Sequence, residues 1–311
     1  MAVMSDWALP EAGTVSPPRR LPSVPSTGGV APLRHRVWLR PATPSQLVDD
    51  GCRVLRRRAR TLIPLVLACT LPIAVGQALA TRSQLNSSDD QGSAFAFGLL
   101  GARGGSFLLS GTLTLLLFGF ARVLVQTLVS GAVALIVVGE RFGTAASMGT
   151  ALKKALRRSP ALFVVWFCVT ASATIGGCTL VGGYALTAFW FVTVPALMIE
   201  DLGPFAAMGR SWRMVARRFW PMLGVSMLTA LVGFLVGYAF ALLALLPVAL
   251  SLLSRWSWLF AGVAAQLNDL VTIPIAAATA AFAYLDLRVR TEGLDLQVAR
   301  LDLVADVAPA R

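Results

Sequence analysis

Residues 159–199 decide the fold: they read SPALFVVWFCVTASATIGGCTLVGGYALTAFWFVTVPALMI and hold no charged side chain in 41 positions. As one helix this stretch would be about 62 Å long, because an α-helix rises about 1.5 Å per residue. That length is about twice the hydrocarbon thickness of a bilayer, which about 20 helical residues span. The run therefore predicts two membrane-spanning helices, with a tight reversal in the glycine-rich stretch 176–183.

Other charge-free runs extend this pattern along the chain. They lie at 61–81, 104–121, 123–139, 219–254 and 270–285. Together the runs predict an all-α membrane protein with about six transmembrane helices, near 61–80, 106–138, 160–177, 182–199, 220–247 and 257–285. A split of 219–285 into three shorter spans is the alternative, and it would place the C-terminus on the opposite side of the membrane.

The composition favours a membrane protein over a soluble or disordered one. Of 311 residues, 56% are hydrophobic and 14% charged, whereas a soluble globular domain carries about 25% charged residues. Lys and Arg outnumber Asp and Glu by 27 to 15, for a net charge of +12. A nucleic-acid-binding protein would explain that balance, but not a mean hydropathy of +0.72. We therefore expect no nucleic-acid partner.

Residue types that carry catalysis are sparse. The only histidine, His35, lies in a polar leader, and the four cysteines form no C-x-x-C pair. A zinc site and a Ser-His-Asp triad are therefore not expected in the folded part. No phosphate-binding loop or dinucleotide fingerprint occurs either. We expect no metal site, no cofactor and no enzymatic activity.

Lys and Arg are distributed unevenly between the two sides that six spans define. Of the 27 cations, 23 fall in segments 1–60, 139–160, 200–220 and 286–311. The opposite connections hold only Arg82, Arg103 and Arg255. Because cytoplasmic loops carry the excess of Lys and Arg, we expect a multi-pass protein of the plasma (inner) membrane with both termini in the cytoplasm.

The ends of the chain differ from its membrane part. Residues 1–40 are rich in Pro, Ser, Gly and Ala, and they lack the apolar core of a secretory signal peptide. We expect a disordered cytoplasmic leader at 1–40, the polytopic membrane domain at 41–290 and a cytoplasmic tail at 291–311.

Two basic loops between the spans resemble each other. Residues 143–158 align without a gap on 203–218, with matching Gly, Ala, Met-Gly and Arg-Arg positions. A fainter copy at 43–60 ends in basic residues, and each copy precedes a hydrophobic hairpin. The pattern predicts three helix-plus-hairpin repeats, each preceded by a cytoplasmic amphipathic helix.

The amphipathic helices are candidate docking elements at the inner face. In the third copy the apolar stripe is expected to hold Phe205, Met208, Trp212, Val215 and Phe219. The cations expected to meet anionic lipid headgroups or protein partners are Lys153, Lys154, Arg157, Arg158, Arg210, Arg213, Arg217 and Arg218. The alternative is a set of ordinary connecting helices that merely obey the positive-inside rule.

Three segments resemble a known family. They are 40–56 (RPATPSQLVDDGCRVLR), 194–212 (VPALMIEDLGPFAAMGRSW) and 284–296 (YLDLRVRTEGLDL). Each resembles a signature of actinobacterial polytopic membrane proteins that are similar to the membrane domain associated with glycerophosphoryl diester phosphodiesterases. The resemblance covers about residues 40–300 and implies a multi-span membrane protein. It does not extend to the catalytic phosphodiesterase barrel, so it implies no activity.

Charged residues inside the predicted spans form the candidate site. Arg122, with Gln126 one turn later, and Asp269, next to Asn268, lie at comparable depths in the second and sixth spans. Charges in the bilayer core are costly, so they are usually paired and often functional. We expect Arg122 and Asp269 to pair in an intramembrane polar network with Gln126 and Asn268. Such a pair is either a structural clamp or a proton- or solute-linked site.

Two classes of function fit these features; the first is the one we expect, and the second is the alternative. The first is a non-enzymatic scaffold, or a subunit of a cell-envelope-associated membrane complex, that docks partners on its basic helices. The second is a transporter or lipid-handling protein that uses the Arg122/Asp269 site. A water-accessible cavity that reaches the pair from one side would favour the second. A lipid-modifying enzyme using Glu140, Glu200 or Asp201 is a more distant alternative, and the sequence leaves the oligomeric state open.

Overall fold

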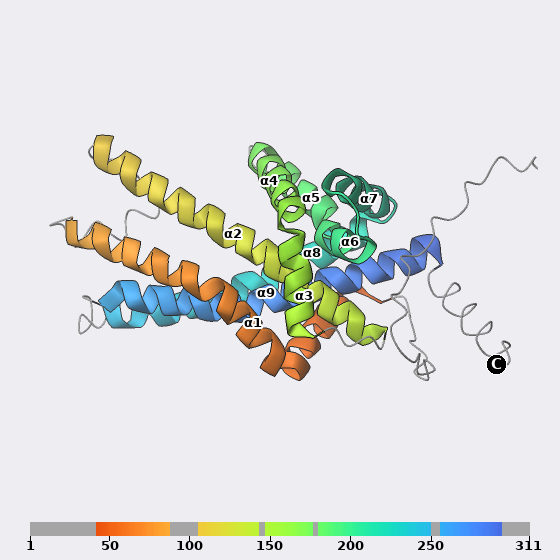
Figure 1. Ribbon diagram of the computed structural model, residues 1–311, viewed down its shortest axis with the longest axis horizontal. Coiled ribbons are helices and arrows are strands. Elements are labelled where there is room, and N and C mark those ends of the chain that lie inside the picture. The colour runs from red at the N-terminus through yellow and green to blue at the C-terminus, as the bar shows by residue number, and fades with distance from the viewer. Residues whose placement is uncertain (1–41, 88–104, 143–146, 177–179, 250–255, 294–311) are drawn as a thin grey trace, which may run out of the picture. The chain divides into compact units, whose positions relative to one another are not determined.

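The chain folds into α-helices wherever the computed structural model describes it, at residues 42–87, 105–142, 147–176, 180–249 and 256–293. No strand occurs in these residues. The helices are α1 (Pro44–Ser87), α2 (Gly105–Arg141), α3 (Met148–Arg157), α4 (Ser159–Gly176), α5 (Leu180–Trp190), α6 (Thr193–Glu200), α7 (Pro204–Ala216), α8 (Phe219–Ala249) and α9 (Ser257–Glu292) (Figure 1). The leader and tail predictions at 1–40 and 294–311 lie outside the described residues.

Five of the described helical stretches are long and apolar enough to cross a membrane. They are Pro44–Ala80, Leu117–Arg141, Gly183–Glu200, Phe219–Leu245 and Ser257–Glu292. The span predicted near 160–177 coincides with α4, whose described apolar stretch, Ser159–Ser172, is shorter than the other five. By the length and composition of its helices, the chain is a multi-pass helical membrane protein.

The charge-free run 159–199 folds into more than two helices. Its first half is α4, which packs against α5, but the returning half breaks after Trp190 and resumes as α6 at Thr193. Pro195 lies in the first turn of α6, where a residue without an N–H group is tolerated, whereas it would disrupt the interior of one continuous helix. Residues 219–285 form the two helices α8 and α9, not three.

Helix α9 is the centre of the bundle and packs against α1, α2, α6, α7 and α8. Its C-terminal half is almost fully buried and rich in alanine, which lets neighbouring helices approach closely. Helix α8 is the opposite case, because its large apolar side chains are mostly exposed, among them Met227, Leu231, Phe234, Leu235, Leu242 and Leu243. In a membrane protein such a surface faces the hydrocarbon of the lipids.

Each short basic helix is followed by an apolar helix after a break at an arginine. Helix α3 ends at Arg157 and is capped by Arg158, whose φ and ψ are −95° and 7°. Helix α7 ends at Ala216 and is capped by Arg217, whose φ and ψ of −71° and −21° stay in the helical region. Helix α1 has a non-helical residue at the matching point, Arg58, with φ −112° and ψ 19°. At its start, the backbone N–H of Thr43 donates to the side-chain Oε1 of Gln46 at 2.9 Å, as a capping box requires.

The buried face of α7 differs from the predicted apolar stripe. Among the residues predicted for the stripe, Val215 is buried, but Phe205 is 72% exposed and Trp212 is 42% exposed. The face turned inward holds Ala207, Ser211, Met214 and Val215. The Ser211 hydroxyl donates to the backbone oxygen of Phe189 at 2.6 Å, and Trp212 stacks on the Phe189 ring with centroids 4.0 Å apart. Small side chains permit this close contact with α5, so the large aromatic residues lie at its edge.

A glycine allows α1 and α9 to meet, and its replacement tests this packing. A Cβ atom on Gly51 would lie 2.4 Å from Oγ1 of Thr279 and 3.1 Å from the backbone oxygen of Ile275. We expect Gly51→Ala to lower the free energy of unfolding by about 1–3 kcal/mol through overpacking, measured by thermal unfolding of the detergent-purified protein.

The control is Gly209→Ala on α7, where an added Cβ meets nothing within 4 Å. This change should be neutral or slightly stabilising, because alanine favours a helix over glycine. Adding Thr279→Ala to Gly51→Ala removes the closest clashing atom and should recover part of the loss. Equal stability of the two glycine variants would contradict the close approach.

Candidate functional site

An ion pair joins α2 and α9 within the spans. The Nη2 atom of Arg122 lies 2.7 Å from Oδ1 of Asp269, and the two side chains are 32% and 9% exposed. Either charge alone would be costly at this depth, whereas the pair offsets part of that cost. The contact ties the first hairpin of the chain to the last.

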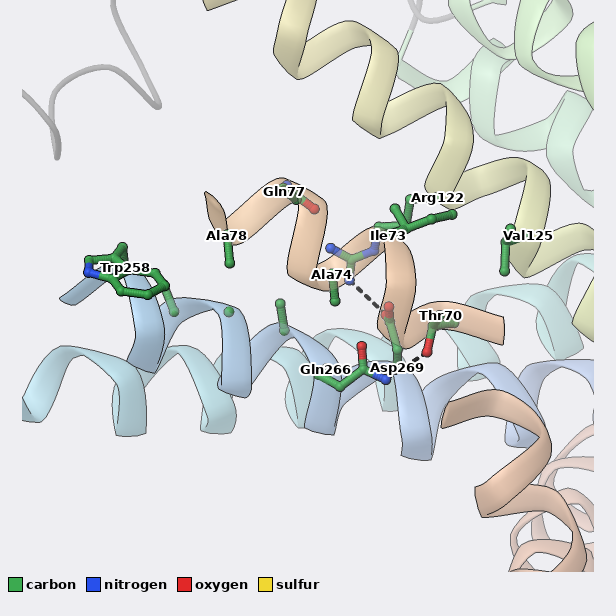
Figure 2. A pocket seen from close by; sticks show the side chains of 13 residues that line it. Thr70, Ile73, Ala74, Gln77, Ala78, Arg122, Val125, Trp258, Gln266 and Asp269 are labelled. Carbon is green, nitrogen blue, oxygen red and sulfur yellow. Dashed lines mark hydrogen bonds and ion pairs between the residues drawn. The ribbon is translucent and has the colours of Figure 1, made fainter. Parts of the chain in front are cut away.

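The ion pair lines a partly open pocket between α1, α2 and α9. The pocket has a volume of about 130 Å³. Its polar and aromatic lining comes from Thr70, Gln77, Arg122, Trp258, Gln266 and Asp269. Figure 2 shows the Arg122 side chain reaching across to Asp269 above the Gln266 side chain. A partly open pocket, mainly apolar but with several polar side chains in its lining, therefore adjoins the charged pair.

Gln266 and Thr70 complete the polar lining on the side of α1. The Nε2 atom of Gln266 donates to Oγ1 of Thr70 at 2.6 Å, and the Thr70 hydroxyl donates to the backbone oxygen of Val66 at 2.8 Å. The Oε1 atom of Gln266 is buried and has no hydrogen-bond partner among the described residues. Thr70 carries no sequence signal, because a threonine that bonds its own helix is common in membrane spans.

Two of the four residues predicted for the network do not join it. The Oδ1 atom of Asn268 faces α8, where a Cβ on Gly237 would lie 3.4 Å from it. Neighbouring residues of a helix point in different directions, so Asn268 cannot share the face of Asp269. Gln126 lies on α2, where its backbone oxygen accepts from the Ser130 hydroxyl, and it does not line the pocket.

The predicted docking cations fall into two groups. Lys154 and Arg158 both pair with Asp201, at 3.1 and 3.2 Å. Arg210 pairs with acidic residues as well and does not lie on a free face. The remaining five are exposed and form no ion pair with a described residue: Lys153, Arg157, Arg213, Arg217 and Arg218.

A second charged cluster, which we call the Glu200 cluster, ties together α6, α7 and α9. It consists of Glu200, Arg210, Tyr284, Arg288 and Glu292. Glu200 Oε1 lies 2.7 Å from Nη2 of Arg210 and 3.8 Å from Nε of Arg288, and it accepts a hydrogen bond from the Tyr284 hydroxyl. Burial disfavours the Arg210 cation, but its bonds to Glu200 and Glu292 outweigh burial and raise the pKa of Arg210 above its ordinary value.

The three segments that carry the family resemblance meet at this end of the bundle. The central and C-terminal segments supply the Glu200 cluster. From the first segment, the backbone N–H of Ala42 donates to Oδ1 of Asp286 at 2.9 Å, and the backbone oxygen of Ala42 accepts from Arg290 at 2.9 Å. We call this end, where α1 starts and α9 ends, the basic end. Residues 244 or more positions apart meet here, which sequence spacing alone could not reveal.

Comparisons with known proteins leave the family open. No family model, no curated protein and no solved structure matches this chain. The resemblance drawn from the three segments therefore stays a prediction. In the described residues, no group of three or more His, Cys, Asp or Glu side chains is placed to hold a metal ion.

The Arg122–Asp269 pair can be tested by a double-mutant cycle. Arg122→Gln and Asp269→Asn should each destabilise the fold, because each leaves one charge without its partner within the membrane. The double variant removes both charges and should lose at least about 1 kcal/mol less than the sum of the single losses. Unfolding of the protein in lipid nanodiscs measures the cycle, and strict additivity would show that the two side chains do not interact.

The Glu200 cluster should contribute more to stability than the neighbouring surface pairs. We expect Glu200→Gln to cost about 2–4 kcal/mol, because it removes one of the two carboxylates that Arg210 and Arg288 share in a mostly buried site and leaves only Glu292 to pair with them. The matched control is Asp201→Asn, which removes the partner of Lys154 and Arg158 at half-exposed positions and should cost less than about 1 kcal/mol.

The control leaves the backbone undisturbed. Asp201 has a φ of 52°, a left-handed conformation that asparagine also adopts readily. Thermal unfolding of both variants under identical conditions gives the comparison. A smaller loss for Glu200→Gln than for Asp201→Asn would contradict a stabilising role of the cluster.

Proposed function

We propose that this protein handles a small polar solute at the pocket between α1, α2 and α9, in the manner of a transporter or a lipid-handling membrane protein. The observation that carries the proposal is the partly open pocket that reaches the Arg122–Asp269 pair. A pair that served only as a clamp would be expected in a dry, closed contact. Here it borders a cavity whose lining also contains Thr70 and Gln266.

We further propose six spans arranged as three helix-plus-hairpin repeats. The supporting features are the arginine breaks at Arg58, Arg158 and Arg217, each of which separates a basic helical segment from an apolar one. Helix α4 supplies the sixth span in this arrangement. With α4 counted as a span, the two helices α8 and α9 support an even number of spans, as a location of both termini on one side requires.

The proposed location is the plasma (inner) membrane, with both termini in the cytoplasm. This location is supported by the exposed cations that α3 and α7 carry, because cytoplasmic segments carry the excess of Lys and Arg. On the cytoplasmic side these cations would meet anionic headgroups. We propose that the protein is not an enzyme.

The second candidate function is a scaffold or subunit of a cell-envelope-associated membrane complex. One observation favours it: five predicted docking cations are exposed and form no ion pair with a described residue. The aromatic side chains of Phe205 and Trp220 are exposed near them, at 72% and 77%. Aromatic and basic side chains together are typical of surfaces that bind a membrane interface or an acidic partner.

A binding screen separates the two candidates. We expect one class of small polar solutes to raise the unfolding temperature of the full chain in nanodiscs, because a ligand at 100 times its Kd stabilises by about 2.7 kcal/mol. Asp269→Asn should abolish that shift, whereas Arg213→Gln, on the exposed face of α7, should keep it. No shift with any solute, together with a stoichiometric protein partner in mild detergent, would favour the scaffold.

A further inference from the structure

The pocket is elongated along two helices. On α1 its lining runs from Thr70 to Ala78, and on α9 from Trp258 to Asp269. At about 1.5 Å per residue, these stretches are about 12 and 17 Å long. Trp258 lies in the first turn of α9, and the Arg82 guanidinium of α1 lies 5.5 Å from the centre of its ring. The pocket is therefore a groove along α1 and α9. It runs from the ion pair to the start of α9, which we call the Trp258 end.

Small residues create this groove. Ala74 and Ala78 on α1 and Ala261, Gly262 and Ala265 on α9 line it, and a Cβ atom on Gly262 would lie 3.6 Å from Cβ of Ala78. The groove does not continue toward the basic end. Beyond Asp269 the facing residues of both helices are buried, at most 4% exposed. They are Ile273, Ala277 and Ala278 on α9 and Leu62, Leu65 and Val66 on α1. The described side chains therefore leave no route toward the basic end, and the groove runs toward the Trp258 end.

Several polar atoms inside the groove have no hydrogen-bond partner among the described residues. The Gln266 side chain is 91% buried, and its Oε1 accepts no hydrogen bond from the described residues. Figure 2 shows that oxygen turned toward Arg122 and Asp269, while the side-chain nitrogen turns to Thr70. Asp269 uses only Oδ1 and Arg122 only Nη2 in hydrogen bonds to described residues. Hydrocarbon satisfies none of these groups, so a hydrogen-bonding molecule must do so.

Charge and size define that molecule. Arg122 and Asp269 cancel in formal charge, so the site offers no net attraction that would offset the cost of dehydrating an ion. Its free atoms include the acceptors Gln266 Oε1 and Asp269 Oδ2 and the remaining N–H donors of Arg122. The volume of about 130 Å³ has room for several water molecules or a small solute.

We propose that the groove between α1 and α9 is a water-filled access path, closed toward the basic end and entered from the Trp258 end, that admits a small neutral solute able both to donate and to accept hydrogen bonds, such as an amide. The inference rests on the proposed function, because it names the route and chemical class of the solute handled at that site. Water occupies the groove in the absence of solute and satisfies Gln266 Oε1.

Cysteine accessibility tests the path without knowledge of the natural solute. In the full chain, with Cys52, Cys69, Cys168 and Cys178 replaced by alanine, single cysteines are introduced at the groove positions Ala74 and Ala265. Their matched controls, Val75→Cys and Val263→Cys, lie on the same helices at outward-facing positions, 49% and 50% exposed. A charged, membrane-impermeant methanethiosulfonate is then added to one side of oriented membrane vesicles.

The groove cysteines should react at least about tenfold faster than their controls, because only a hydrated thiol ionises to the reactive thiolate. The faster reaction should occur only from the side of the Trp258 end. Equal rates at groove and control positions, or faster reaction from the side of the basic end, would overturn the path. A variant that unfolds exposes groove and control positions alike, so every variant must elute like the wild type in gel filtration. A second control blocks the groove with Ala265→Trp, and in that background Ala74→Cys should react slowly.

Protection experiments test the class of solute with two isosteric pairs. Acetamide should slow modification of Ala265→Cys about threefold at concentrations where acetate does not, and urea should do so where guanidinium does not. Protection by the ions but not by the neutral members would overturn the assignment. Groove reactivity without any thermal shift in the solute screen would contradict the proposed function alone, whereas a thermal shift without groove reactivity would overturn the path alone.

Discussion

The arrangement of charge in this chain follows from the lack of water in the hydrocarbon core of a bilayer. A charged group placed there must find a partner or a hydrated cavity. The structure meets this constraint in two ways. Most ion pairs between described residues gather at the basic end, including Arg58–Glu140 and Arg141–Asp50, which tie α1 to α2. Arg122 and Asp269 lie apart from them, and this pair alone borders the pocket.

Helix α9 connects the two regions. Near its middle it carries Asp269 and Gln266, and in its last turns it carries Asp286, Arg288 and Glu292. The same helix is the most buried of the candidate spans, because alanines let α1 and α8 pack closely around it. Its acidic side chains therefore anchor arginines from α2 and α7 on opposite parts of one rigid element.

Local features of the structure were largely predictable. The lengths of the apolar runs predict α2, α8 and α9 to within a few residues, because only helices satisfy their own backbone within lipid. Equal depth in two spans also predicts that Arg122 can reach Asp269. The same reasoning failed for Asn268, since depth says nothing about the direction in which a side chain leaves its helix. It also missed Glu200 as the centre of a cluster, because Tyr284 and Arg288 are far away in the sequence.

The sequence by itself determined the class of this protein. Long apolar stretches cannot fold in water without burial, so the helices and their capacity to span a membrane could be read from the order of residues. Only the tertiary structure decided which polar groups meet. Thr70, Gln266, Arg122 and Asp269 come from three helices, and the space they share depends on the rotation of each helix about its axis. That rotation is set by packing between small side chains such as Gly51 and the alanines of α9, a property of facing surfaces that no single stretch of sequence contains.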